Sequence, residues 1–150
     1  MATTTDSALK VLRGFFKAMH DWEWALIRED FADIEDWPAE KAEKEVEKRY
    51  GKLRQQMAKI FDRYCEVGVK ARRVRDALHS GGAEPDYNPE TERILSVTEK
   101  PGKIIVETQM AHNFQFRFKY EVVNVNGKWL LRDNRKCKAA GDEKWSRWDL

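Results

Sequence analysis

Apolar residues recur at helical spacing over the first 36 residues, which predicts an amphipathic helical segment. The positions three or four residues apart are Leu12, Phe15, Met19, Trp22 and Leu26, and the stripe is widened by Phe16, Ile27, Phe31 and Ile34. Thr5, Asp6 and Ser7 offer N-terminal caps. Because a pattern that runs to Asp36 is long for one helix, we expect a bend or break after Trp24.

A second helix is predicted after Pro38. A proline pushes the residue before it out of the helical region, so the first segment ends here, and Pro38 suits the first turn of a new helix. Two pairs of opposite charge four residues apart, Glu40–Lys44 and Glu45–Arg49, favour this helix. Its apolar stripe consists of Val46, Tyr50, Leu53, Met57, Ile60 and Tyr64.

The rest of the chain has the pattern of strands. Residues 67–90 carry glycines and prolines that break regular structure, with at most a short edge strand at 67–71. After them, alternation predicts strands at 93–98, 103–110, 114–122 and 128–133. Pro101-Gly102 and Asn126-Gly127 are turn pairs between strands. The run from Phe114 to Val122 places aromatic residues on one face, as in a half-buried strand.

Helices followed by a meander of strands indicate the α+β class, with the N-terminal helices packed on one face of an antiparallel sheet. The length of 150 residues fits a single domain, residues 1–150. The tail carries Trp145 and Trp148, and we expect it to dock on the domain.

Composition and charge narrow the class of function. Hydrophobic residues make up 41% of the chain and aromatic residues 11%, which is typical of a packed globular protein. The formal net charge of +2 gives no overall field that would favour nucleic acid or a membrane surface. The sequence has neither a secretory signal nor an apolar run of about 18 residues that could cross a bilayer, so we expect a cytoplasmic protein with no membrane contact.

The sequence carries no motif of a catalytic or metal centre. It lacks a glycine-rich phosphate loop, a nucleophile elbow and a His-Glu-x-x-His helix. The residues that could bind zinc do not have the spacing of a zinc site; they are His20, His79, His112, Cys65 and Cys137. We therefore expect no metal, no cofactor and no catalytic residue. The two cysteines are expected to be free thiols, and a single bridge between them stays open.

An enzymatic alternative also stays open. A concave sheet closed by helices can enclose a pocket for a small molecule. Glu23, beside the apolar stripe, and Tyr64 and Tyr120, which should point inward, are the candidate acid–base groups of such a pocket. Inward tyrosines are more often core residues whose hydroxyl groups are hydrogen-bonded. Glu23 at the edge of the stripe can equally be solvated.

Acidic residues are concentrated between Asp21 and Asp36. Seven acids and one base, Arg28, give these sixteen residues a net charge of −6. Neighbouring like charges cost helix stability, so the stretch suggests a basic partner surface, with a solvated helix end as the alternative. The candidate partner-binding residues are Asp21, Glu29, Asp30, Asp33, Glu35 and Asp36. The basic run of residues 70–75 lacks the interleaved aromatic residues of a nucleic-acid site, so nucleic acid is not an expected partner.

Five short runs, taken in order, resemble a known family. They are Met19-His20-Asp21-Trp22-Glu23, Asp86-Tyr87-Asn88-Pro89-Glu90, Glu107-Thr108-Gln109, Phe118-Lys119-Tyr120 and Asn126-Gly127-Lys128-Trp129-Leu130-Leu131. Over roughly residues 10–148, this order resembles the immunity proteins with a nuclear-transport-factor-two-like fold, small bacterial proteins that neutralise a cognate polymorphic toxin.

The resemblance implies a strongly curved, cone-shaped antiparallel sheet wrapped around the helices. It implies a function of stoichiometric binding to a cognate protein toxin in the cytoplasm, without turnover, and it is compatible with a homodimer. The same superfamily includes isomerases and dehydratases, so a small-molecule enzyme or ligand-binding module of the same fold is the alternative. No catalytic motif of those enzymes maps onto this chain.

Overall fold

The structure, a computed structural model, describes residues 3–66, 87–110, 116–132, 135–139 and 141–147. Two long helices come first, α1 (Thr4–Ile27) and α2 (Ala39–Tyr64), with a short 3-10 helix between them, η1 (Ala32–Ile34). Six described strands follow, β1 (Glu92–Lys100), β2 (Lys103–Met110), β3 (Arg117–Val125), β4 (Lys128–Leu131), β5 (Lys136–Lys138) and β6 (Ser146–Arg147). All six belong to one antiparallel sheet, which confirms the predicted α+β class. The edge strand considered at 67–71 and the start of the strand expected at 114 lie outside the described residues.

α1 begins with a capping box. The Thr3 hydroxyl accepts a hydrogen bond from the Asp6 N–H at 3.0 Å, and the Asp6 carboxylate accepts one from the Thr3 N–H at 3.2 Å. These bonds satisfy amide groups that the start of a helix leaves without partners. The cap therefore lies at Thr3, ahead of the predicted caps. The predicted break after Trp24 is confirmed, because α1 ends at Ile27.

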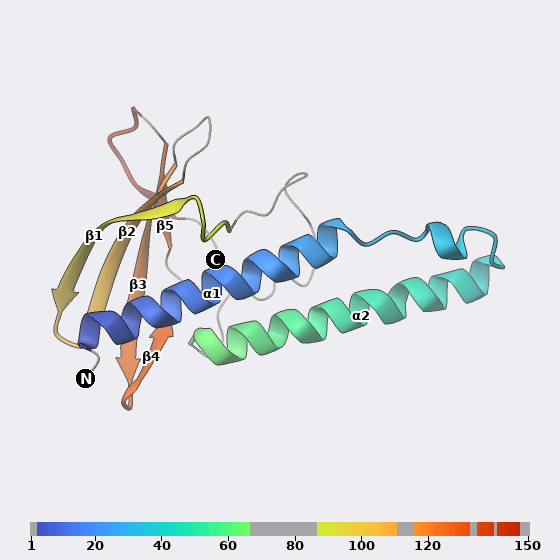
Figure 1. Cartoon of the computed structure of the whole chain (residues 1–150), viewed down its shortest axis with the longest axis horizontal. Coiled ribbons are helices and arrows are strands. Elements are labelled where there is room, and N and C mark those ends of the chain that lie inside the picture. The colour runs from blue at the N-terminus through green and yellow to red at the C-terminus, as the bar shows by residue number, and fades with distance from the viewer. Residues whose placement is uncertain (1–2, 67–86, 111–115, 133–134, 140, 148–150) are drawn as a thin grey trace.

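The two helices lie side by side and antiparallel, against the inner face of the curved sheet (Figure 1). An arm extends beyond the strands (Figure 1). It consists of the end of α1, the whole of η1 and the start of α2. We call residues 28–38, which close this arm, the arm tip. α2 is buried at Leu53, Met57 and Phe61, whereas Val46 and Tyr50, nearer the arm tip, are only half-buried.

The inner strand pairs follow the predicted alternation. β2 spans the residues predicted for it, and β2 and β3 pair with Ile104 opposite Val122 and Thr108 opposite Phe118. β4 pairs with the C-terminal part of β3 and β5 with its N-terminal part. β5 and β6 were not predicted, because such short strands carry too little periodicity to detect.

The described part of the tail is docked, as predicted. β6 pairs with β5 at the edge of the sheet. The ammonium groups of Lys119 and Lys138 lie 4.3 and 5.0 Å from the ring centre of Trp145, within cation–π distance. Trp148 lies outside the described residues.

A bulge in β1 decides which of its residues face the core. The register passes from Ile94 opposite Thr108 to Ser96 opposite Glu107, so Leu95 is the extra residue. Leu95 is 41% exposed, while Ile94 packs against the core. Because an extra residue shifts the alternation of a strand by one position, Glu92 and Ile94 before the bulge and Val97 after it all reach the inner side.

The core fills the space between the helices and the sheet. Its buried helical members are Ala8, Leu12, Phe15, Phe16, Met19, Trp22, Leu53, Met57 and Phe61, and its strand members are Ile104, Val106, Met110, Phe118, Tyr120, Val122, Leu131 and Cys137. β3 has the aromatic inner face that the alternation predicted. No described helix is both long and apolar enough to cross a bilayer.

Candidate functional site

The sheet buries a carboxyl group, that of Glu92, at the start of β1. Glu92 is 7% exposed. Its Oε1 accepts hydrogen bonds from the Thr108 hydroxyl at 2.7 Å and from the Tyr120 hydroxyl at 3.0 Å. Burial raises the pKa of Glu92, and the two hydroxyl donors oppose that rise. Three adjacent strands thus converge on one carboxyl oxygen.

Arg135, just before β5, places a positive charge in the same cluster. It is buried, and its Nη1 donates to the Tyr120 hydroxyl at 3.4 Å. Its guanidinium carbon lies 5.1 Å from the ring centre of Tyr87 and 4.8 Å from that of Phe118. Burial raises the pKa of Tyr120, and the nearby Glu92 raises it further. Tyr120 therefore stays a neutral phenol that can donate to Glu92.

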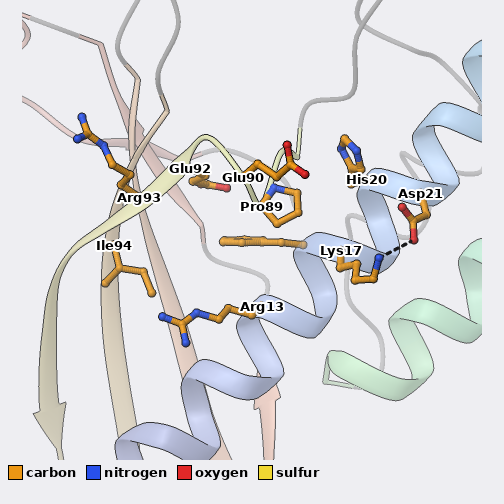
Figure 2. A pocket seen from close by; sticks show the side chains of 10 residues that line it. Arg13, Lys17, His20, Asp21, Pro89, Glu90, Glu92, Arg93 and Ile94 are labelled. Carbon is orange, nitrogen blue, oxygen red and sulfur yellow. Dashed lines mark ion pairs between the residues drawn. The ribbon is translucent and has the colours of Figure 1, made fainter.

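A pocket of about 890 Å³ opens beside this cluster, between α1 and the start of β1 (Figure 2). Its walls are formed by Arg13, Phe16, Lys17, His20 and Asp21 of α1 and by Pro89, Glu90, Glu92, Arg93 and Ile94. Glu92 belongs both to the buried cluster and to the pocket wall. Its second oxygen, Oε2, is buried and has no hydrogen-bond partner among the described residues.

The hydrogen bond of His20 defines which of its nitrogens carries the proton. Nδ1 lies 2.7 Å from the carbonyl oxygen of Tyr87. A carbonyl oxygen can only accept, so Nδ1 carries a proton and is the donor. On the same helix, Lys17 and Asp21 form an exposed ion pair at 3.5 Å. One acid of the pocket rim is therefore already partnered.

The three residues predicted for an interior pocket lie in different environments. Tyr120 is buried and bonded to Glu92. Glu23 is buried in the last turns of α1. Tyr64 is half-buried at the end of α2, with its ring centre 6.3 Å from that of Phe15. None of the three is among the described residues that line the pocket beside Glu92, and no described hydrogen bond joins them to one another.

Aromatic rings occupy the space inside the curved sheet. The ring centre of Tyr87 lies 5.3 Å from that of Phe15 and 5.7 Å from that of Phe16. The ring of Phe16 in turn lies 5.1 Å from that of Tyr120. All four residues are buried. The geometry therefore makes Tyr120 part of a packed core.

Arg49 of α2 gathers the acidic side chains of the arm. Its guanidinium contacts both carboxylate oxygens of Asp33, at 3.0 and 2.6 Å, and Glu45 at 3.1 Å. Glu29 lies 3.6 Å away, and the ring centre of Phe31 lies 5.6 Å from the guanidinium carbon. The hydrogen bonds from Arg49 hold the pKa of Asp33 below its ordinary value. The guanidinium group of Arg49 thus holds the arm tip against α2.

The remaining candidate acids divide between two places. Asp30 accepts a hydrogen bond from the Ala32 N–H at 2.8 Å and so fixes the turn into η1. Glu35 and Asp36 are exposed and form no ion pair with the described residues. Asp21 lies at the pocket rim. Of the six acids predicted from sequence, the structure therefore brings five together at the arm tip and places one at the pocket.

Sequence reasoning missed Glu92 and Arg135. A signal was available, because Tyr120 was predicted to point inward, and a buried hydroxyl group needs a hydrogen-bonding partner. Tyr87, Thr108 and Tyr120 also belong to the runs that carry the family resemblance. The structure brings these three residues together around the two buried charges.

The structure shows no arrangement typical of a metal or redox centre in the residues it describes. Over those residues, no group of three or more His, Cys, Asp or Glu side chains could hold a metal ion. Cys65 and Cys137 are both buried and are not joined by a disulfide. Burial raises the pKa of the Cys137 thiol, which disfavours the reactive thiolate.

Comparison with known proteins gives a family match over nearly the whole chain. The model of the family described as NTF2 fold immunity protein matches residues 7–149. No curated protein and no solved structure matches the chain.

Proposed function

We propose that this chain, which belongs to the family of NTF2 fold immunity proteins, neutralises a cognate protein toxin by binding it stoichiometrically in the cytoplasm. The observation that carries this proposal is the family match, because it spans residues 7–149 and so includes all of α1 after its first three residues, the whole of α2 and all the described strands. An inhibitor of this kind needs a stable, complementary surface and no catalytic group.

The arm tip is the proposed contact surface for the toxin. It projects beyond the sheet (Figure 1) and carries Glu35 and Asp36, which form no ion pair with the described residues. Arg49 fixes its shape through Asp33, so the acids are presented on an ordered scaffold. Such a surface is complementary to a basic patch, and complementary charges speed encounter and select the partner.

The affinity must come from more than these charges. A nanomolar complex requires about −12 kcal/mol, usually from roughly 800 Å² of buried surface on each partner. Exposed acids contribute little to that sum, because solvent screens them. We therefore expect the acids of the arm tip to govern the association rate. Aromatic side chains, such as Trp37 in the arm tip and Trp24 near the end of α1, are expected to anchor the complex.

Affinity capture of the full chain from its own cells, followed by native mass spectrometry, tests the proposal. A polypeptide that co-purifies in a fixed molar ratio, and that stops growth when expressed without this chain, is the expected result. A chain that carries only a small molecule, or a co-purifying polypeptide with no effect on growth, would overturn it.

The alternative of a small-molecule enzyme gains no support from the interior geometry. The acid–base groups proposed for it are Glu23, Tyr64 and Tyr120, and no described hydrogen bond joins them. Tyr120 packs against Phe16, whose ring centre lies 5.1 Å from its own, and Phe16 packs against Tyr87, so this side chain is part of the buried core. The same mass spectrum tests this alternative, because a bound metabolite would appear as an added mass.

A further inference from the structure

We propose that the pocket beside Glu92 receives an arginine side chain of the protein partner. This inference rests on the proposed function for the existence of a partner, and it adds where one of that partner's side chains is held. The pocket lies between α1 and the start of β1, apart from the arm tip (Figures 1 and 2).

One end of the pocket offers hydrogen-bond acceptors that lack donors. Glu92 Oε2 is buried without a partner among the described residues, although Glu92 itself is more than nine-tenths buried. Glu90 is exposed and forms no described ion pair. His20 faces this end from α1, with Nδ1 bonded to the Tyr87 carbonyl group and Nε2 in no described hydrogen bond. Figure 2 shows the two glutamates on the β1 side and His20 on the helix side.

A guanidinium group has the properties that this set of acceptors requires. A buried acceptor without a donor is unfavourable, and the planar fork of arginine carries five N–H donors that can reach two carboxylates at once. Its positive charge would also favour the ionised form of Glu92. The ring of Phe16, which lines the same pocket, offers an apolar wall on which a guanidinium can stack.

The basic residues of the pocket do not occupy this end. Lys17 is paired with Asp21 at 3.5 Å. Arg93 points away from α1 (Figure 2). Arg13 lies seven residues before His20 on α1, about 10 Å along the helix axis. The buried Arg135 offsets the charge of Glu92 from the core side, but its described hydrogen bond goes to the Tyr120 hydroxyl and none joins it to Glu92. The exposed carboxylate of Glu90, which has no described ion pair, is therefore the charge that favours a cation over an anion at the His20–Glu90 end.

Two short peptides test the assignment without any toxin. N-acetyl-Gly-Arg-Gly-amide and its citrulline counterpart have nearly the same shape, but only the arginine peptide is charged. Each is titrated into the full ¹⁵N-labelled chain and followed by NMR. We expect saturable shifts at the amides of residues 90–93 and at the His20 ring with the arginine peptide, and binding of the citrulline peptide at least about tenfold weaker.

Three variants locate the binding. Glu90→Gln changes an exposed side chain, and Glu92→Gln keeps the oxygen that accepts from Thr108 and Tyr120, so both are expected to fold. Each should weaken binding of the arginine peptide about tenfold or more. Glu43→Gln, on the exposed face of α2, should leave that affinity unchanged. Equal binding of the two peptides, absence of saturable shifts, or unchanged affinity in both pocket variants would overturn the assignment.

The failure of this inference and that of the proposed function are distinguishable. A captured toxin that binds the Glu90→Gln, Glu92→Gln double variant as tightly as the wild-type chain would refute the pocket assignment alone. If no toxin exists for this chain and the pocket still prefers the arginine peptide, only the proposed function is refuted.

Discussion

The Tyr120 hydroxyl donates to Glu92 Oε1 over 3.0 Å, although the two residues lie on strands that do not pair with each other. β2 lies between those strands and contributes Thr108, which donates to the same oxygen at 2.7 Å. The carboxyl group of Glu92 therefore links three strands through side chains, in addition to the backbone ladder. Because all three residues are buried, each donor replaces a bond to water that folding removes.

Thr108→Val should lower the free energy of unfolding by about 1–3 kcal/mol, because it removes a donor from a buried carboxyl group while keeping the side-chain shape. Urea denaturation measures the change. Thr98→Val is the matched control, since Thr98 is exposed in β1, and it should change the stability by less than about 0.5 kcal/mol. Equal effects of the two substitutions would mean that the hydrogen bond at 2.7 Å contributes nothing.

The buried carboxyl group also predicts how stability depends on pH. Burial raises the pKa of Glu92 above its ordinary 4.5, so the folded state keeps this proton at pH values where the unfolded state has released it. The contribution of Glu92 to stability must then fall as pH rises above about 4.5, by at most about 1.4 kcal/mol per pH unit for one proton.

Glu92→Gln removes this titration. The difference in unfolding free energy between the variant and the wild-type chain should therefore grow in favour of the variant as pH rises above about 4.5. Urea denaturation at pH values from 4 to 8 measures it. Curves that stay parallel over this range would show that the pKa of Glu92 is not raised in the folded chain.

Two helical glycines offer a matched test of packing. A Cβ atom on Gly14 would lie 2.8 Å from Cε1 of Tyr64, whereas a Cβ on Gly51 would meet no atom within 4 Å. Gly51→Ala should stabilise the chain by about 0.5–1 kcal/mol through helix propensity alone. Gly14→Ala should be less stable than Gly51→Ala by about 1–3 kcal/mol, because the Tyr64 ring must move. Equal thermal midpoints would contradict the close approach of α1 and α2.

Arg49 is predicted to order the arm tip and to have little effect elsewhere. Arg49→Gln removes the contacts to Asp33, Glu45 and Glu29, all of which lie at the exposed end of the arm. We expect faster amide hydrogen exchange over residues 32–37 and unchanged exchange in β2 and β3. Lys48→Gln, an exposed neighbour with no described ion pair, is the control. Faster exchange over the whole chain would show instead that Arg49 supports the core.

Charge reversal at the arm tip should act on the association rate with the toxin. The double variant Glu35→Lys, Asp36→Lys changes exposed acids that hold no described ion pair, so the fold should be unaffected. Association should slow several-fold at low salt, the difference should shrink as salt is added, and dissociation should change less. Glu143→Lys, an exposed acid near β6, is the control. An unchanged association rate at low salt would remove the arm tip from the interface.

The helices and the inner strands could be predicted because their patterns are local. The apolar stripe from Leu12 to Leu26 has the period of a helix, and the alternation through Phe118 and Tyr120 has the period of a strand. Each pattern also indicates which face is buried. The break in the first helix was also predictable, because no single helix easily spans that pattern. The cap was displaced to Thr3 because the capping box needs Asp6 as its third helical residue, and so fixes the start of the helix.

The candidate pocket could not be predicted because it depends on long-range contacts. Glu92 is a glutamate at the start of a strand, a position that is normally solvated. Its burial follows from Thr108 and Tyr120, and from a bulge at Leu95 that no local pattern indicates. The acids of the arm were predicted as a cluster. Their contacts with Arg49 could not be predicted, because these depend on the antiparallel packing of α2 against α1.

If this chain inhibits a toxin by stoichiometric binding, cell survival must depend on the molar ratio of the two proteins, and graded co-expression measures that dependence. The captured polypeptide is expressed at a fixed level, this chain at increasing levels, and both amounts are quantified together with cell survival. Protection that begins only when this chain reaches a fixed molar ratio to the toxin, near the ratio in the captured complex, is the predicted result. Full protection by a small molar fraction of this chain would indicate catalysis, and absence of protection at molar excess would show that the chain is not the inhibitor.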